Sequence, residues 1–384
     1  MTISAASTIE ETTPLDPVTI RRRGVGLRLC DRERSAGGYT LFTPQTGNGA
    51  VYLIDMDGKV AHQWQMPVRP GREGVLLPNG NLGYNGSHAT SLALYPAWDL
   101  WHGGDFYEAT PDGEIVWRHE DPRHHHDAQW LANGHLLYTV CEALPPEISA
   151  RICGGDERKD AADGIIQGDT VVEVDRNGEI VWQWRCWEHL APEDFPIHDI
   201  FDRRHWPLIN GLHATDDGLV LMSLRVTSGI IAIRRDTGEV VWKIGPDILA
   251  QQHSPIMTPA GTVLAFDNGN LRKGATSPHS RIVEVEPQTG ELVWQYADEN
   301  APAFFTPYMG GCQLLENGNV FVCESAFGRL FEVTRSGETV WEYVIPFFDA
   351  YPPEVRKYTD GQHNGSFRAY RYPESRIPWL AGRN

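Results

Sequence analysis

The amino-acid sequence predicts an all-β fold, a six-bladed β-propeller of four-stranded blades, because two repeats interleave along the chain. The first repeat is a polar turn with a glycine, followed by a run of alternating β-type residues. Five of its six copies place Trp four residues after the glycine, and in the other copy Trp64 follows Gly58 by six. The copies occupy residues 55–64, 110–119, 175–184, 235–244, 287–296 and 334–343.

The second repeat is another hairpin, centred on a different glycine turn. Two hairpins per unit give four strands, and the units recur every 47 to 65 residues, which is typical of propeller blades. A solenoid or two stacked sandwiches is the structural alternative. The turn glycines of this repeat are Gly80, Gly134, Gly218, Gly261 and Gly318.

Six copies of the first repeat against five of the second predict that one blade is split between the chain ends. We expect the segments GYTLFTP and VYLIDMDG near the N-terminus to pair with SFRAYRY at 366–372. Residues 37–384 then form a single propeller domain, and residues 1–36 form a flexible or wrapping arm.

Three segments interrupt the repeat: 88–107, 142–170 and 185–207. They are long, irregular and rich in Pro, Gly, Asp, His and Trp. Loops of this length usually carry binding or catalytic residues. A short helix is expected within 143–164.

Composition limits the possible partners. The chain has 51 Asp and Glu against 33 Lys and Arg, a net charge of −18. This excess argues against nucleic-acid and anionic-membrane partners, which need a basic face. No apolar stretch approaches the 18 to 20 residues of a transmembrane helix. The predicted partner is a small aromatic or anionic substrate, and a homo-oligomer is possible.

The chain start and the cysteines favour the cytoplasm. The first residues lack a basic start followed by an apolar core, so we expect no secretion signal. The six cysteines show no C-x-x-C pair and no metal-ligand spacing, which predicts buried or idle thiols in a reducing compartment.

Counting from the turn glycines of the second repeat predicts which residues face the channel. Strand residues two apart share a face, so both sets counted back are expected to point towards the channel mouth. Eight residues back lie Arg72, His126, Asn210, His253 and Gly310, and ten back lie Pro70, His124, Leu208, Gln251 and Tyr308. Seven residues forward lie Ser87, Cys141, Arg225, Asn268 and Ser325.

Two histidines at one register, with two arginines and a tyrosine, suit an anionic aromatic ligand. Each residue also has a plainer interpretation. Residues 124–127 are alternatively a solvated turn, His253 a hydrogen-bonded core imidazole, and Arg225 the partner of a structural carboxylate.

Segments 124–137, 209–225, 238–269 and 280–296 resemble the arylsulfotransferase family, six-bladed propellers that use phenolic sulfate esters. The resemblance spans roughly residues 38–372. It implies that His253 is the nucleophile that becomes a sulfohistidine. It also implies that Arg225 is the arginine of the family's S-x-R motif, and that His125 or His126 is the histidine of its H-H-D motif. At the position of a further family histidine this chain has Leu208.

The roles expected from this resemblance are chemically coherent. A neutral imidazole at His253 attacks without a metal, so no cofactor is expected. Arg225 and Arg72 stabilise charge on the sulfate oxygens, and His126 acts as general acid and then as general base. The other expected substrate-binding residues are His124, His125, Tyr308, Asn210 and Asn268.

Other functional classes stay open at this stage. A metal-dependent hydrolase or lyase would hold zinc or another divalent metal through His124, His126 and His253. Further imidazoles for such a site are His88, His205 and His363. A non-catalytic binding propeller is a third possibility. A quinoprotein is a fourth, since RDTGEVVW at 235–242 resembles a docking motif of that class.

Overall fold

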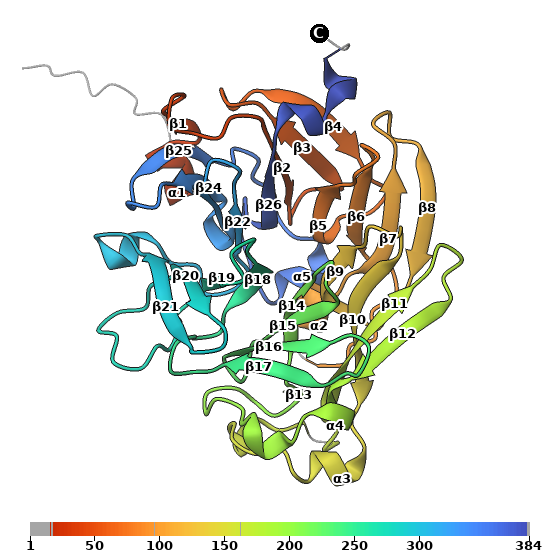
Figure 1. The fold of residues 1–384 in the computed structure, drawn as a ribbon. Coiled ribbons are helices and arrows are strands. Elements are labelled where there is room, and N and C mark those ends of the chain that lie inside the picture. The colour runs from red at the N-terminus through yellow and green to blue at the C-terminus, as the bar shows by residue number, and fades with distance from the viewer. Residues whose placement is uncertain (1–15, 17, 96, 162, 382–384) are drawn as a thin grey trace, which may run out of the picture.

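The computed structural model describes residues 16, 18–95, 97–161 and 163–381. Its six sheets are arranged as the blades of a β-propeller around a central channel (Figure 1). The predicted fold class is therefore confirmed. In the described residues, no helix is long and apolar enough to cross a membrane.

Each blade has four antiparallel strands, and the first strand named for each blade is the one nearest the channel. The first three blades are β5 (Pro70–Leu76), β6 (Leu82–Ser87), β7 (Gly104–Ala109) and β8 (Ile115–Glu120); β9 (His124–Trp130), β10 (Leu136–Ala143), β11 (Gln167–Val174) and β12 (Ile180–Arg185); and β14 (Ile209–Ala214), β15 (Leu219–Leu224), β16 (Gly229–Arg234) and β17 (Val240–Ile244). The next two are β18 (His253–Met257), β19 (Val263–Asp267), β20 (Arg281–Glu286) and β21 (Glu291–Tyr296); and β22 (Gly311–Leu314), β23 (Val320–Glu324), β24 (Arg329–Val333) and β25 (Thr339–Val344).

The sixth blade is closed by strands from both ends of the chain. Its order is β26 (Ser366–Tyr372), β2 (Tyr39–Pro44), β3 (Ala50–Ile54) and β4 (Val60–Gln65). β26 pairs antiparallel with β2, which is the predicted closure. In addition, β1 (Gly26–Cys30) pairs with β25 of the neighbouring blade, so part of the predicted arm forms a fifth strand there. Residues 1–15 and 17 of that arm lie outside the described residues.

The repeated tryptophans explain how neighbouring blades are joined. The indole N–H of Trp64 donates to the backbone oxygen of Thr110, in the outer turn of the next blade, at 3.0 Å. The indole N–H groups of Trp117, Trp182 and Trp294 each donate in the same way to a backbone oxygen in the outer turn of the blade that follows their own. Trp341 closes the ring by donating to Met56. The repeat in the sequence thus encodes a hydrogen bond between blades as well as a strand.

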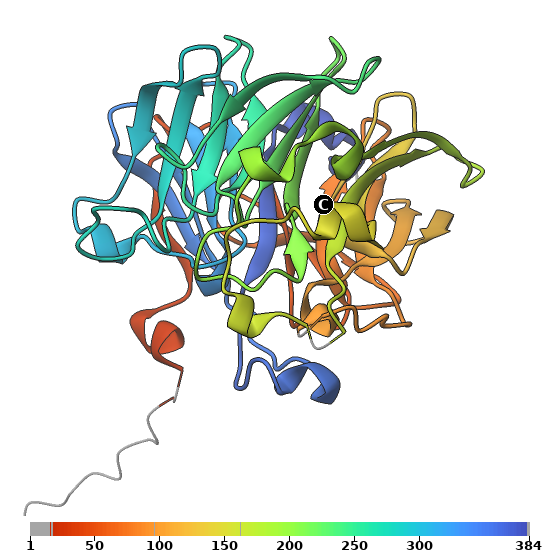
Figure 2. The same ribbon diagram turned by 90° about the horizontal axis from the view of Figure 1, so that it is seen from below.

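Short helices lie in the loops rather than in the blades. They are α1 (Thr19–Arg23), α2 (Trp98–Trp101), α3 (Pro146–Ser149), α4 (Cys186–His189) and α5 (Pro353–Arg356). The helix expected within 143–164 is α3. α2 and α5 pack together through Leu100, Tyr351 and Val355 at one end of the propeller (Figure 2). The interrupted segments also supply β13 (His205–Trp206), which pairs parallel with β11.

The inner strands are bulged, which the sequence did not indicate. Their pairing with the next strand skips extra residues at 71–73 in β5, 125–127 in β9, 210 in β14, 254–255 in β18 and 367–368 in β26. A bulge breaks the two-residue alternation and re-aims side chains. The polar residues of the channel lie at or next to these bulges.

Candidate functional site

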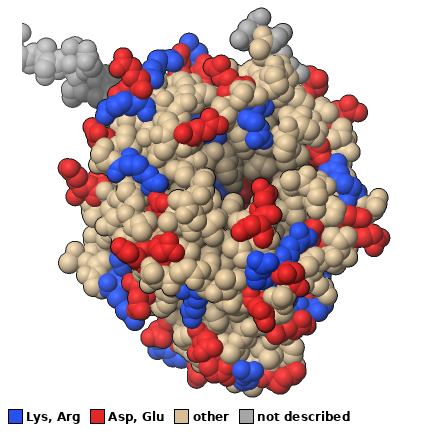
Figure 3. All heavy atoms as spheres, in the orientation of Figure 1, with Lys and Arg blue, Asp and Glu red and all other residues tan. Residues whose placement is uncertain are grey.

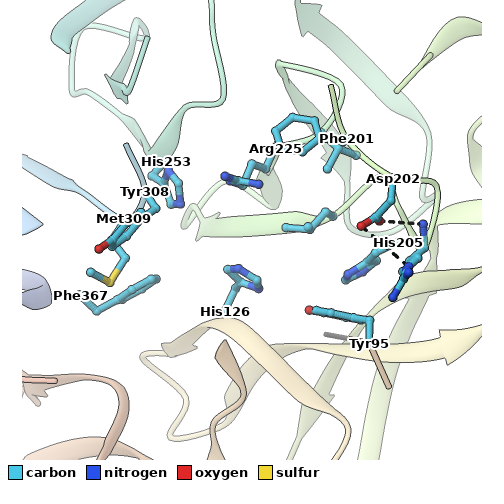
Figure 4. A pocket seen from close by; sticks show the side chains of 13 residues that line it. Tyr95, His126, Phe201, Asp202, His205, Arg225, His253, Tyr308, Met309 and Phe367 are labelled. Atoms are coloured by element: carbon cyan, nitrogen blue, oxygen red, sulfur yellow. Dashed lines mark hydrogen bonds and ion pairs between the residues drawn. The ribbon is translucent and has the colours of Figure 1, made fainter. Parts of the chain in front are cut away.

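A pocket of about 220 Å³ opens at one mouth of the channel (Figure 4). The inner strands contribute His126, Leu208, His253, Tyr308, Met309 and Phe367 at or near their ends, and Arg225 and Val226 follow β15. The long loops contribute Tyr95, Phe201, Asp202, Arg204 and His205. Two of the three irregular segments, 88–107 and 185–207, therefore line the pocket, as loops of this length often do.

His253 is held in one tautomer by Asn268. The Nδ1 of His253 lies 2.7 Å from Oδ1 of Asn268. The amide nitrogen of Asn268 donates to the backbone oxygens of Thr306 and Met309, so its oxygen must be the atom that faces the imidazole. His253 therefore carries its proton on Nδ1. The lone pair is left on Nε2, as a nucleophile requires.

His253 is neutral at ordinary pH. Burial lowers the pKa of its imidazole to about 3, and the positive charge of Arg225 adds to the effect, whereas the hydrogen bond to Asn268 opposes it. The side chain is almost fully buried in the protein but reaches the pocket wall. Position, tautomer and charge state together give His253 a nucleophilic nitrogen in the pocket.

Arg225 has no carboxylate partner in the described part of the chain. Its guanidinium stacks over the ring of Phe201 at 4.9 Å and points into the pocket (Figure 4). Burial lowers its pKa to about 10, so it stays charged at neutral pH. The plainer expectation, that Arg225 pairs with a structural carboxylate, does not hold among the described residues, where its guanidinium lies over the ring of Phe201 instead. A cation placed in this way favours an anionic ligand.

Arg72 is a second cation without an acidic partner among the described residues. It is completely buried, and its Nε and one terminal nitrogen have no hydrogen-bond partner. Its guanidinium lies 5.3 Å from the ring of Phe367, which lines the pocket. Arg72 does not line the pocket itself, so it adds positive potential from behind the wall rather than direct contact.

The three adjacent histidines point in three directions because of the bulge in β9. His126 has a positive φ of 55° and lines the pocket. His124 is fully buried between blades, where its ring nitrogens contact Thr139 and Asn85. His125 points to the loop side, and its Nε2 lies 2.8 Å from Oδ1 of Asp169. The expectation that His124 and His126 share a face is thus wrong.

The other expected ligand-binding residues are divided between the pocket and its support. Tyr308 lines the pocket. Asn210 is buried and donates to the backbone oxygen of Gln252, and Asn268 supports His253. Neither asparagine lines the pocket. Leu208, at the position of the further family histidine, forms part of the wall.

Tyr95 and Phe201 are pocket residues that counting from the turn glycines did not find. Both lie in long loops whose register to the strands cannot be read from the repeats. The Tyr95 hydroxyl is buried without a hydrogen-bond partner in the described structure, and it points into the pocket (Figure 4). Only the composition of these loops, rich in aromatic and polar residues, hinted at their role.

The channel beyond the pocket is closed by paired charges. Arg368 on β26 contacts both carboxylate oxygens of Asp127, at 2.8 and 2.7 Å, and Glu73 at 3.2 Å. The hydroxyl of Tyr370 donates to Glu73 at 2.9 Å. All three charged groups are buried. A second cavity, which includes Glu73, Arg368 and Tyr370 in its wall, lies at the other end of the channel.

The three histidines considered as metal ligands are not brought together. The only group of potential ligands with closely spaced atoms in the described residues is His125, Cys141, Asp169 and His205, next to the pocket. Of these four, only His205 reaches the pocket wall.

The fold and the pocket define a six-bladed β-propeller with a histidine- and arginine-lined cavity at one channel mouth. The chain belongs to the arylsulfotransferase (ASST) family, whose model matches residues 97–345. The family resemblance noted in the sequence is thereby confirmed. No curated protein has a significant match to this sequence.

Among solved structures, similar proteins are found at low sequence identity. A protein of unknown function from Bacteroides caccae is 14% identical, with a TM-score of 0.52 over 80% of this chain and 93% of its own. A streptogramin B lyase is 11% identical, with a TM-score of 0.46 over 84% and 83%. Virginiamycin B lyase from Staphylococcus aureus, solved as an inactive variant with quinupristin, is 11% identical, with a TM-score of 0.45 over 85% and 90%. At 14% identity, the similarity to the Bacteroides caccae protein concerns the fold alone.

Proposed function

We propose that this protein moves a sulfuryl group from an aryl sulfate to a phenolic acceptor, with His253 as the covalent carrier. The observation that carries the proposal is the Asn268–His253 pair, which presents an unprotonated Nε2 in the same pocket as Arg225, an arginine with no acidic partner in the part of the chain that the structure describes. Family membership supports the same assignment.

In the first half-reaction, Nε2 of His253 attacks the sulfur and forms an N–S bond, while the bond from sulfur to the phenolic oxygen breaks. The imidazole gains positive charge, and its Nδ1 proton is held by the oxygen of Asn268. Arg225 faces the pocket, where its guanidinium stabilises the charge on the sulfate oxygens. Arg72 raises the potential of the same region from behind Phe367.

His126 faces the same cavity from β9 (Figure 4). Burial lowers the pKa of His126 well below its usual value, so its imidazole is neutral. From this position its N–H donates a hydrogen bond to the departing phenolate, which leaves as the anion, and the neutral imidazole then accepts the proton of the acceptor phenol and passes it to solvent. In the second half-reaction the acceptor oxygen attacks the sulfur, the N–S bond breaks, and His253 returns to its neutral form. The rings of Phe367 and Tyr308 and the thioether of Met309 form an apolar side suited to an aromatic ring.

The proposal is tested by incubating the protein with 4-nitrophenyl sulfate and measuring its intact mass. We expect a stoichiometric gain of about 80 Da, one sulfuryl group, together with one equivalent of released 4-nitrophenol. His253→Ala should show neither. His213→Ala is the matched control, since His213 lies at the other end of the channel, and it should form the adduct as the wild type does. An adduct that persists in His253→Ala, or no adduct and no phenol from a panel of aryl sulfates, would overturn the proposal.

A further inference from the structure

Four side chains with metal-binding atoms converge in the blade that carries His126. They come from adjacent strands: His125 from β9, Cys141 from β10, Asp169 from β11 and His205 from β13. Cys141 and Asp169 are directly opposite each other in the β10–β11 pairing, and β13 joins β11 at Gln167 and His205. The sheet therefore fixes the positions from which the side chains meet, even though they lie up to 80 residues apart.

The potential ligand atoms lie within 4.8 Å of one another. Nε2 of His125 and Nε2 of His205 are both 2.8 Å from Oδ1 of Asp169, and Sγ of Cys141 is 3.6 Å from Nε2 of His205. Ligand atoms around a tetrahedral zinc ion are about 3.3 to 3.6 Å apart, given the usual zinc–nitrogen and zinc–sulfur bond lengths. The two contacts to Asp169 would have to lengthen by about half an ångström, and the sulfur contact already fits.

Hydrogen bonding alone leaves this cluster incomplete. The contact between Nε2 of His125 and Asp169 is short but poorly aligned for a hydrogen bond, so in the described residues this buried nitrogen has an ion-pair contact and no well-aligned hydrogen-bond partner. Native structures rarely leave a buried polar atom in this state without a reason.

The charge of Asp169 also favours a bound cation at this cluster. Asp169 is fully buried, and its ion-pair contacts in the described structure are two imidazoles, with no lysine or arginine. A divalent cation bound to one carboxylate and one thiolate gives a site with no net charge, which a buried location favours.

We propose that His125, Cys141, Asp169 and His205 bind one divalent transition metal, zinc by the chemistry of the donor set. Two imidazoles, a thiolate and a carboxylate suit this class of ion and not magnesium or calcium, which prefer oxygen ligands. On binding, the thiol of Cys141 loses its proton to solvent and the metal–sulfur bond forms, with no change of oxidation state. The site differs from the set His124, His126 and His253 expected from the sequence.

The metal would act by positioning. All four ligands are buried, and with four protein ligands the centre is closed, as in structural zinc sites. Nδ1 of His125 lies 2.9 Å from Nδ1 of His126. With its Nε2 on the metal, neutral His125 carries its proton on Nδ1 and donates it to His126. The proton of a neutral His126 is then on Nε2, the nitrogen that does not face His125, so the metal would set the tautomer of a pocket residue.

The proposal does not rest on sulfuryl transfer, because metal binding is measured without substrate. The first experiment measures the metal content of the full-length protein, purified without an affinity tag, after Zn²⁺ loading and dialysis. One zinc per chain is expected in the wild type and in Cys186→Ala. Cys186 is a buried thiol of the same blade that lies outside the cluster, so it is the matched control. Cys141→Ala and Asp169→Asn should lose most of the zinc.

A second measurement needs no variant and therefore no assumption about folding. Wild-type protein loaded with Co²⁺ should show the intense near-ultraviolet band of a cobalt–thiolate bond and the visible bands of a tetrahedral ion. Histidine-selective ¹⁵N spectra of zinc-loaded and metal-stripped protein should show different tautomers for His126. A zinc content far below one per chain, or a cobalt complex without the thiolate band, would overturn the proposal. Zinc retained in full by a folded Cys141→Ala variant would overturn it as well.

Discussion

The two ends of the channel differ in whether their buried arginines are paired with carboxylates. At the pocket end, Arg225 and Arg72 have no acidic partner among the described residues. At the other end, Arg368 is paired with both Asp127 and Glu73. On the face of the molecule drawn in Figure 3, acidic and basic side chains are mixed around a central hollow. The net charge of −18 is a sum over the whole chain. It therefore does not reveal the positive charges of Arg225 and Arg72 at one mouth of the channel.

The comparison separates groups that stabilise the fold from groups that bind a ligand. A buried ion pair satisfies its own charges and is costly to break. A buried cation without a partner costs stability, and a bound anion would offset that cost. The following predictions test this division, in order of decreasing effect.

The largest effect is expected from Arg368→Met, which leaves Asp127 and Glu73 buried without their cation. The free energy of unfolding should fall by about 3–5 kcal/mol, measured by urea denaturation. Arg151→Met is the control, since Arg151 and Glu193 form an exposed ion pair whose loss should change the free energy of unfolding little. Equal losses in the two variants would contradict the structural role of Arg368.

Arg225→Met should reduce the rate of the reaction without reducing the stability of the fold. Sulfuryl uptake from 4-nitrophenyl sulfate should slow by about 100- to 1,000-fold, the usual loss when one preorganised donor to a developing oxyanion is removed. The free energy of unfolding should stay the same or increase, because an uncompensated cation leaves the interior. Rapid-quench measurement of phenol release and urea denaturation test the two parts. A destabilised variant with normal phenol release would show that Arg225 stabilises the fold and does not take part in the reaction.

Asn268→Ala should reduce the rate of adduct formation by about 10- to 100-fold through the misplacement and changed tautomer of His253. Since Asn268 does not line the pocket, the affinity for the aryl sulfate should change little. The kcat and KM of the phenol-release step, measured separately, distinguish positioning from binding. A large rise in KM with normal kcat would assign Asn268 to substrate binding instead.

The smallest effect is expected from pH. A histidine with a lowered pKa stays unprotonated as pH falls, and it loses its nucleophilic lone pair only as pH passes through the lowered value. Since the pKa of His253 is about 3, the single-turnover burst of phenol release should be nearly constant from pH 8 to pH 5. The leaving group 4-nitrophenolate needs little protonation, so the burst reports the nucleophile. A loss of activity centred near the ordinary histidine pKa of about 6.5 would contradict the assignment.

Most of the fold was predictable because propeller blades repeat. The glycine turns and the tryptophans mark every blade, and the five turn glycines of the second repeat have nearly the same φ, 83° to 86°. Counting along the same repeat led to His126, His253, Arg225 and Tyr308, all of which line the pocket.

The rest of the site depends on departures from that repeat. His126, Leu208 and Met309 line the pocket with positive φ angles, which residues other than glycine rarely adopt and which no repeat pattern reveals. The bulge in β9 turns His124 away from the pocket and His125 towards Asp169. Cys141, expected to be an idle thiol, lies beside His205 because the strand β13 comes from a loop outside the repeat.

The closing strand β26 supplies part of the pocket wall. β26 follows every other described strand in the sequence, yet it occupies the innermost position of its blade. It brings Phe367 to the pocket wall and Arg368 to Asp127, which was synthesised 241 residues earlier. A nascent chain that stops short of β26 has an open ring without this wall and this ion pair. A variant truncated before β26 should therefore lose the pocket, although most of the residues that line it lie upstream of the deleted strand.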